Sequence, residues 1–281
     1  MVHRVRARPP RGVPGVCPHP LDGPASAQSD RGASVSYRHF SAQVTRVTPL
    51  TPHMTRITLG GLEDFPGAGL DHRVKVFFPL PGEDRPVYPT GDDWWERWQR
   101  EPVRAVFRTY TIRRHRPELG EVDIDFVLHG DEGPGSRWAS NARPGDHVGL
   151  WGPRAEYAPP PGTDWVLLAG DETALPAIGA ILESLPRDAT ARVFVEVASP
   201  EERQHLDAPK GAEVRWVHRS DGESLLAAVR EAGLPPGRPY AWVAAESSAV
   251  KQIRRHLVDD RGIDREAIYF SGYWKRGAAQ E

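Results

Sequence analysis

The sequence predicts a two-domain protein of the β + α/β class, in which an antiparallel β-barrel precedes a small doubly wound domain with a parallel sheet. The chain has 281 residues, which is enough for two separate cores. Apolar and polar residues alternate up to about residue 160, whereas continuous apolar runs and helical stretches follow residue 162. We therefore assign residues 35–160 to the barrel domain and residues 163–281 to the α/β domain.

The barrel assignment depends on period-two patterning. Val122, Ile124, Phe126 and Leu128 are apolar at every second position, as in a strand with one face buried. Turns rich in Pro and Gly separate this run from others like it. These other runs occupy residues 54–59, 73–78, 106–113 and 147–151. Several short antiparallel strands of this kind are typical of a closed barrel.

The second domain alternates apolar strands with helices, which is typical of a parallel sheet covered on both faces. The expected strands are residues 165–169, 192–197, 213–218 and 240–245. The expected helices are residues 174–185, 223–232 and 247–260. Ligands of such domains bind where the strands end, so this half is expected to take a nucleotide.

Residues 1–34 are rich in Arg, Pro, Gly and Ser and hold too few apolar residues to offset the entropy of ordering. We interpret them as a disordered tail. The alternative is a basic arm for nucleic acid, which the small number of arginines disfavours.

Composition excludes several classes of function. The formal net charge of −2 gives no overall positive field for nucleic acid or anionic lipid. Because Cys17 is the only cysteine, this chain alone forms no disulfide, Cys-based zinc site or iron–sulfur cluster. No apolar run reaches the length of a membrane span, and we expect a monomeric cytoplasmic protein without a metal site.

The first motif with specific chemistry is Arg108-Thr109-Tyr110-Thr111. Strand alternation places Arg108 and Tyr110 on one side. An Arg can pair with a pyrophosphate, and a Tyr can pack against an aromatic ring. By itself this motif could equally be an ordinary strand with an exposed arginine.

A Gly-rich turn about 20 residues downstream, His129-Gly-Asp-Glu-Gly-Pro-Gly-Ser-Arg-Trp-Ala139, enters a short helical stretch. Such a turn presents backbone N–H groups and a helix N-terminus to phosphate. A third element, Gly149-Leu-Trp-Gly-Pro-Arg154, ends the barrel. The order and spacing of the three elements resemble the siderophore-interacting protein family, a branch of the ferredoxin-reductase-like flavoproteins.

The resemblance covers residues 36–277. It includes Asp71-His-Arg-Val-Lys-Val-Phe-Phe-Pro79, Leu168-Ala-Gly-Asp-Glu-Thr-Ala-Leu-Pro-Ala-Ile178 and Tyr269-Phe-Ser-Gly-Tyr-Trp-Lys-Arg-Gly277. It implies an FAD-binding barrel with the cofactor held non-covalently. It also implies a set of FAD contacts: Arg108, Tyr110, Thr111, His129, Gly133, Ser136, Trp138, Ala139 and, beside the isoalloxazine, Trp274. From the residues alone, a surface role for His129 and core packing of Trp274 remain open.

The segment Ala169–Pro176 follows an apolar strand and opens a helix. It lacks the Gly-x-Gly-x-x-Gly pattern, and a capped helix start explains it equally well. The resemblance implies nicotinamide and ribose contacts through Thr173, Ala174 and Pro176, with Glu246 as a further candidate. The donor is therefore NADH, NADPH or, as in some relatives, a ferredoxin.

The resemblance implies a ferric siderophore as the electron acceptor, bound by the basic residues Lys75 and Arg154. A third basic position of some relatives is occupied here by Tyr269, so Lys275 and Arg276 are the remaining candidates. Each of these cations alone could also be an ordinary surface charge. The Trp-rich insert at 92–98 either packs beneath its own loop or stacks aromatic rings of the acceptor.

The sequence thus predicts an FAD-dependent ferric-siderophore reductase whose redox chemistry resides in the flavin, with no catalytic side chain. Two alternatives keep part of this assignment: a flavin reductase with another acceptor, and a siderophore-binding protein without enzymatic activity. A barrel that binds nucleic acid fits the acidic balance least well.

Overall fold

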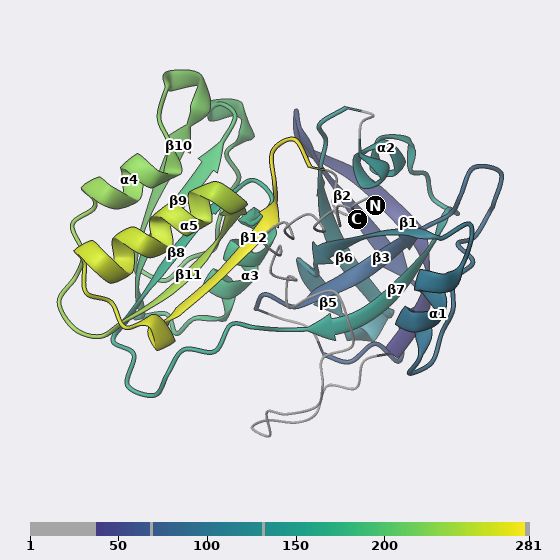
Figure 1. Cartoon of the computed structure of the whole chain (residues 1–281), viewed down its shortest axis with the longest axis horizontal. Helices are drawn as coiled ribbons and strands as arrows, with labels where there is room; N and C mark the ends of the chain where they lie inside the picture. The colour runs from purple at the N-terminus through teal and green to yellow at the C-terminus, as the bar shows by residue number, and fades with distance from the viewer. Residues whose placement is uncertain (1–37, 68–69, 131–132, 279–281) are drawn as a thin grey trace, which may run out of the picture.

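The structure, a computed structural model, describes residues 38–67, 70–130 and 133–278. The tail predicted for residues 1–34 lies outside the described residues. Figure 1 shows two bodies side by side: a curled antiparallel sheet that contains β1–β7 and a parallel sheet that contains β8–β12. The β + α/β class predicted from the sequence is confirmed.

The first body is a seven-stranded sheet in the order β4-β3-β7-β1-β2-β6-β5. Its strands are β1 (Arg38–Thr51), β2 (Met54–Gly60), β3 (Arg73–Phe78), β4 (Val106–Thr111), β5 (Arg114–Arg116), β6 (Glu121–Val127) and β7 (His147–Arg154). Its apolar interior holds the alternating residues that the sequence singled out, including Val122, Ile124 and Phe126, all fully buried.

A bend in the chain brings the two edges of this sheet together. The sequence pattern predicted one strand over 106–113, but β4 ends at Thr111 and β5 begins at Arg114. The backbone N–H of Ile112 still donates to His72 beside β3, whereas that of Arg113 donates to Asp123 on β6. The sheet therefore closes into a barrel at Ile112 and Arg113, where the chain passes from the β4 edge of the sheet to the β5 edge.

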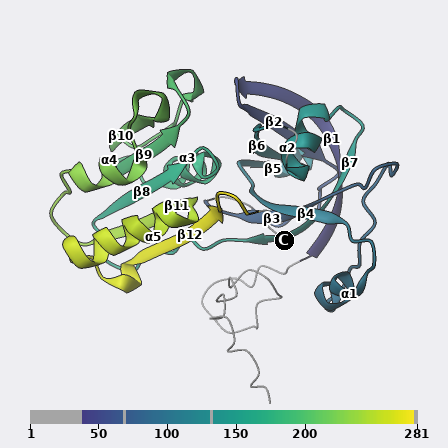
Figure 2. The same ribbon diagram turned by 45° about the horizontal axis from the view of Figure 1, so that its top comes forward.

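Two helices cover the barrel at different places (Figure 2). Helix α2 (Pro134–Asn141) packs against β4 and β6, and Ala139 enters the barrel core. Helix α1 (Trp94–Arg100) lies on the outside of the sheet, away from the second body. The first of the insert's tryptophans, Trp94, is buried against Phe77, and Trp95 stacks on Trp98 at 5.2 Å between ring centroids. The insert therefore packs as a helix beneath which the tryptophans form a small core.

The second body has the strand order β10-β9-β8-β11-β12, and every neighbouring pair is parallel. The strands are β8 (Trp165–Asp171), β9 (Thr190–Val197), β10 (Gly211–His218), β11 (Pro239–Glu246) and β12 (Ile268–Trp274). Helix α3 (Leu175–Ser184) covers the face towards the barrel, whereas α4 (Leu225–Glu231) and α5 (Ser247–Arg255) cover the other face. The doubly wound arrangement is confirmed, and β12 is the strand of this second body that periodicity missed.

Candidate functional site

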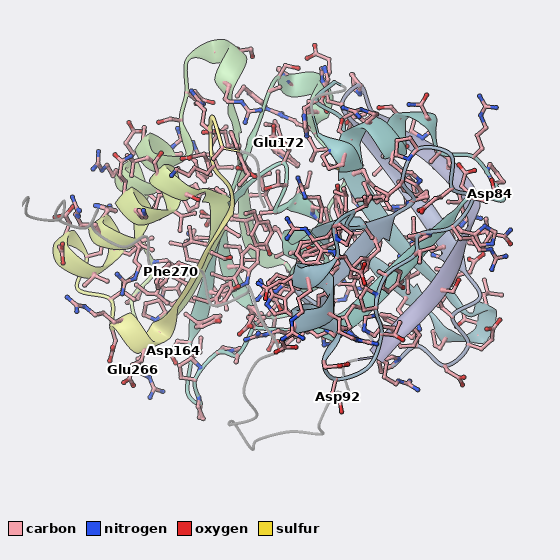
Figure 3. The ribbon with its side chains drawn as sticks, turned by 45° about the vertical axis from the view of Figure 1, so that its right-hand side comes forward. Asp84, Asp92, Asp164, Glu172, Glu266 and Phe270 are labelled. Atoms are coloured by element: carbon pink, nitrogen blue, oxygen red, sulfur yellow. The ribbon has the colours of Figure 1, made fainter. Side chains whose placement is uncertain are left out.

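The carboxyl ends of the parallel strands face the junction with the barrel. In Figure 3, Glu172, which follows β8, lies at the end of the domain opposite Asp164 and Glu266, which precede β8 and β12. A cleft of about 210 Å³ opens there between the two bodies, lined by His129 from the barrel and by Glu172, Leu175 and Ala198 from the strand ends. This is the position at which doubly wound sheets bind ligands.

The Arg-x-Tyr-Thr motif lies on β4 beside this junction. Arg108 is half-buried, and its guanidinium donates to the backbone carbonyl of Phe107 at 2.7 Å. Burial lowers the pKa of Arg108, and no carboxylate pairs with it among the described residues. Arg108 is therefore a partly desolvated cation that an anionic ligand would stabilise.

Tyr110 does not project freely from the strand. Its ring packs against Phe126 at 4.2 Å between centroids, and burial raises the pKa of its hydroxyl. A Cβ placed on Gly135 would lie 1.9 Å from that hydroxyl, so only glycine lets α2 approach β4 this closely. Thr111, the last residue of the motif, is buried, whereas Thr109 is exposed.

The Gly-rich turn enters α2 with a fixed shape. Gly133 is the residue that precedes the helix, and a side chain there would meet the His129 ring at 2.8 Å. The buried Ser136 hydroxyl accepts from the backbone N–H of His129 and donates to the carbonyl of Gly130. Ser136 thus shapes the turn with its side chain, which leaves the backbone N–H groups of the first helical turn as donors for a ligand.

The remaining barrel residue of the predicted set, Trp138, packs against Phe78 and Phe126 at 5.3 and 5.6 Å. A half-buried cation, an uncapped helix start and a glycine-dependent close approach therefore lie together at one end of the barrel. This donor set fits the pyrophosphate of a dinucleotide such as FAD, because it offers positive charge and N–H groups in one place.

On the parallel sheet, Asp171 connects several of the residues predicted to contact the cofactors. Its buried carboxylate accepts the backbone N–H of Thr173 at 3.0 Å and the indole N–H of Trp274 at 2.7 Å. Ala174 and Pro176 are buried in the packing of α3 against the sheet. Glu246 accepts from the backbone N–H groups of Ser248 and Ala249 and so caps α5. The sequence interpretation missed Asp171 altogether.

The predicted acceptor cations lie on neighbouring strands. Lys75 on β3 pairs in register with Trp151 on β7, and its ammonium lies 4.4 Å from the ring centroid of Phe107 and 5.7 Å from that of Trp95. Arg154, at the end of β7, pairs with Glu156. The exposed Lys275 and Arg276, which directly follow β12, belong to the other body.

Arg73 is a cation that the sequence interpretation did not select. It shares the Glu156 carboxylate with Arg154, at 3.0 Å, and it donates to the hydroxyl of Tyr269 on β12 at 2.8 Å. One carboxylate therefore faces two guanidinium groups, with Lys75 two residues further along β3. The group of Arg73, Glu156 and Arg154 therefore lies where the barrel meets β12.

A barrel with a half-buried cation beside a glycine-dependent turn, followed by a parallel sheet whose ligand edge faces it, is the two-domain arrangement of the ferredoxin-reductase-like fold. A ferredoxin reductase in carbazole 1,9a-dioxygenase shares this fold: it has 17% identity and a TM-score of 0.59 over 86% of this chain and 71% of that chain.

The chain belongs to the siderophore-interacting protein family. Residues 43–157 match the siderophore-interacting FAD-binding domain, and residues 163–277 match the siderophore-interacting protein domain. A siderophore utilization protein from T. fusca is 39% identical and has a TM-score of 0.77 over 86% of this chain and 95% of that chain. The ferric vibriobactin reductase ViuB of Vibrio cholerae is 34% identical over 86% of this chain and 95% of the relative.

Proposed function

We propose that the protein is an FAD-dependent ferric-siderophore reductase. Its sequence matches the family in both domains. The observation that carries the proposal is that the guanidinium groups of Arg73 and Arg154 share the Glu156 carboxylate where the barrel meets β12, with Lys75 two residues further along β3. Ferric siderophores present iron in hard oxygen donors and are often anionic, so cations at this junction favour their approach.

When bound, FAD converts the two electrons of a hydride into single electrons for ferric iron. Arg108 and the N-terminus of α2, with the backbone between Gly133 and Ser136, would hold the pyrophosphate. Thr111 lies at the end of β4, nearest to the second body, where we place the ring contact. His129, Trp138 and Ala139 lie at the same end of the barrel. They line the proposed FAD site or pack beneath the residues that line it.

The electron donor enters from the carboxyl edge of the parallel sheet. Thr173 and the start of α3, with Ala174 and Pro176, form one side of this entry, and Glu246 at the start of α5 forms another. NADH or NADPH fits the edge of a doubly wound sheet, and a reduced ferredoxin is the alternative donor.

One NAD(P)H supplies two electrons, reduces two ferric siderophores and releases one proton. Ferrous iron is less charged and softer, so the hard oxygen donors of the siderophore hold it weakly and release follows reduction. Lys75 and Arg154, with Lys275 or Arg276 from the other body, hold the anionic complex and take no part in bond making.

The test is the double substitution Lys75→Ala with Arg154→Ala. If each contact contributes about 0.5–2 kcal/mol, the apparent KM for an anionic siderophore rises roughly 5-fold to several hundred-fold, with a smaller effect on a neutral one. Rising salt erodes the difference. Reduction of bound FAD by NAD(P)H keeps its rate.

The matched control is Lys251→Ala with Arg265→Ala, which removes two exposed cations from the second body. Equal turnover of anionic and neutral acceptors by the parent and the double variant at low salt would place the acceptor elsewhere. Turnover of quinones or free flavins without any siderophore dependence would favour a reductase with another acceptor. Action in the cytoplasm and a monomeric state are part of the proposal, checked by cell fractionation and by light scattering.

No helix among the described residues is both long and apolar enough to cross a membrane.

A further inference from the structure

Asp171 is the last residue of β8 and one of the most connected buried groups at the junction. Its side chain is 3% exposed. One carboxylate oxygen accepts the backbone N–H of Thr173 at 3.0 Å and its hydroxyl at 2.5 Å. The other oxygen accepts the backbone N–H of Glu246 at 3.0 Å and the indole N–H of Trp274 at 2.7 Å.

These bonds join three elements that are distant in sequence: the turn before α3, the start of α5 and the end of β12. All three lie at the carboxyl edge of the parallel sheet. Because an indole nitrogen only donates, the orientation of Trp274 depends on where its acceptor lies. Ser247 fixes the same residue from the other side, since its hydroxyl donates to the Trp274 carbonyl at 2.9 Å.

The charge state of Asp171 suits this role. Burial and the neighbouring Glu172 raise the pKa of Asp171 to about 6, so the carboxyl is ionised at neutral pH and all four donors can be accepted. Arg219 pairs with Glu172 at 2.5 Å, which limits the repulsion between the two acids. The Glu246 carboxylate is directed away to the start of α5.

We propose that Asp171 is a positioning residue that holds the Thr173 turn and the Trp274 indole at a fixed separation, so that they form two sides of the space where the nicotinamide meets the flavin ring. The proposal rests on the proposed function for the identity of the two rings. The link between Asp171 and Trp274 itself is a property of the protein without cofactor. Loss of the carboxylate frees the indole and widens this space, while the barrel contacts to FAD stay in place.

The first test uses the protein without flavin. In a ¹H–¹⁵N spectrum, the indole N–H resonance of Trp274 is assigned by its disappearance in Trp274→Phe. We expect Asp171→Asn to move this resonance upfield and to speed its exchange with solvent at least 10-fold, because the carboxylate acceptor is lost. The matched control is Asp260→Asn, which removes an exposed acid that pairs with His256 in the same body and leaves the resonance unchanged.

The second test uses the protein loaded with FAD. Asp171→Asn is expected to slow reduction by NAD(P)H about 10-fold or more, with FAD affinity within about 2-fold of the parent. Electron transfer from chemically reduced protein to the ferric siderophore keeps its rate, because that step does not involve the nicotinamide. Trp274→Phe, which leaves the acid intact, reproduces the slow reduction if Asp171 acts through the indole.

An unchanged Trp274 resonance together with unchanged reduction in Asp171→Asn would overturn the proposal. If Asp171→Asn does not fold, Thr173→Ala and Trp274→Phe each remove one side of the arrangement, and parental reduction rates in both would equally overturn it. If the parent protein binds FAD but reduces no ferric siderophore, the proposed function fails while the reduction step still tests Asp171. If the parent binds no FAD at all, the indole resonance alone decides whether Asp171 holds Trp274.

Discussion

Arg108 shows how a single partly buried cation can determine cofactor retention. Burial lowers its pKa, and no carboxylate pairs with it among the described residues, so a bound pyrophosphate would compensate its desolvation. We expect Arg108→Ala to weaken FAD binding by about 1.5–3 kcal/mol, roughly 10-fold to 150-fold in Kd, measured by fluorescence titration of the flavin-free protein. The melting temperature of the flavin-free protein should change little. Arg265→Ala, which removes an exposed cation, serves as the control, and an equal loss of affinity there would argue against a pyrophosphate contact.

His39 gives the barrel a dependence on pH. It lies on β1 among the rings of Phe77, Tyr88, Trp94 and Trp151, and burial lowers its pKa from 6.5 to about 4. Between these two values the unfolded chain takes up a proton that the folded protein does not. The free energy of unfolding therefore falls as pH decreases through this range. Above pH 6.5 the ring is neutral in both states, and His39 causes no loss of stability.

We expect His39→Phe to reduce the acid-induced loss of stability between pH 7 and pH 4.5 by about 1–2 kcal/mol, since solvent screens part of the charge on this partly exposed residue. Urea unfolding at the two pH values measures it. His205→Gln, which changes an exposed histidine, should retain the parental loss. A parental pH profile in His39→Phe would show that His39 titrates normally.

The residues of the candidate site stay predictions from the sequence, and the contacts of their side chains could not be predicted from it. Ser136 was expected to contact FAD, yet its hydroxyl is used to shape the turn. Glu246 was expected beside the nucleotide, and its carboxylate caps α5. Asp171 was not among the predicted residues, and its carboxylate accepts from Glu246 and Trp274, which lie 75 and 103 positions away in the sequence. These partners are brought together by the tertiary fold, and a local sequence pattern carries no information about them.

At the scale of single elements, α2 depends on glycine at one position. A Cβ on Gly135 would overlap the Tyr110 hydroxyl, so α2 or Tyr110 must move. We expect Gly135→Ala to lower the free energy of unfolding by about 1–3 kcal/mol and to weaken FAD binding, because the start of α2 shifts away from β4. Calorimetry and a flavin titration measure the two effects.

Gly233→Ala provides the matched control, because nothing lies within 4 Å of a Cβ at that position. It should leave stability within about 0.5 kcal/mol of the parent and FAD affinity unchanged. If Gly135→Ala keeps the parental stability, a side chain at this position is tolerated, and the close approach of α2 to Tyr110 does not require glycine.

Periodicity predicted most strands and all three helices of the second body, because their apolar faces follow the period of the element. It missed β1, the three-residue β5 and β12. β1 has mixed exposure, with only Ala42 and Val44 fully buried, so its pattern is weak. β12 lies at an edge of the sheet, and Phe270 is exposed there. The tryptophans of the insert gave no period either, since α1 has only seven residues.

At the scale of the whole molecule, buried polar contacts hold the two bodies together. Arg113, at the bend of the barrel, lies against Gly179 of α3 and pairs with Glu183 at 2.5 Å. Asp71 accepts the backbone N–H groups of Glu156 and Tyr157 in the linker. The proposed site lies between the bodies, so these contacts hold its two sides in place.

We expect Glu183→Gln to lower the free energy of unfolding by about 1–3 kcal/mol, because the Arg113 guanidinium is buried and loses its charged partner. Cleavage of the linker between residues 155 and 162 by a nonspecific protease should become faster. Thermal unfolding and limited proteolysis measure the two effects. Asp207→Asn, which breaks an exposed pair with Arg187, is the control, and equal sensitivity of both variants would show that Arg113 does not join the bodies.

The place of β12 at the edge of the parallel sheet has a consequence for the protein at high concentration. An edge strand presents unpaired backbone groups that can add a strand from another molecule. Phe270 is 44% exposed on this strand, and the guanidinium of Arg254 lies 4.3 Å from its ring centroid. A charge fixed at that point disfavours the approach of a second edge. The strand that ends at Trp274 thus also has a charged side chain over its exposed ring, which disfavours aggregation through this edge.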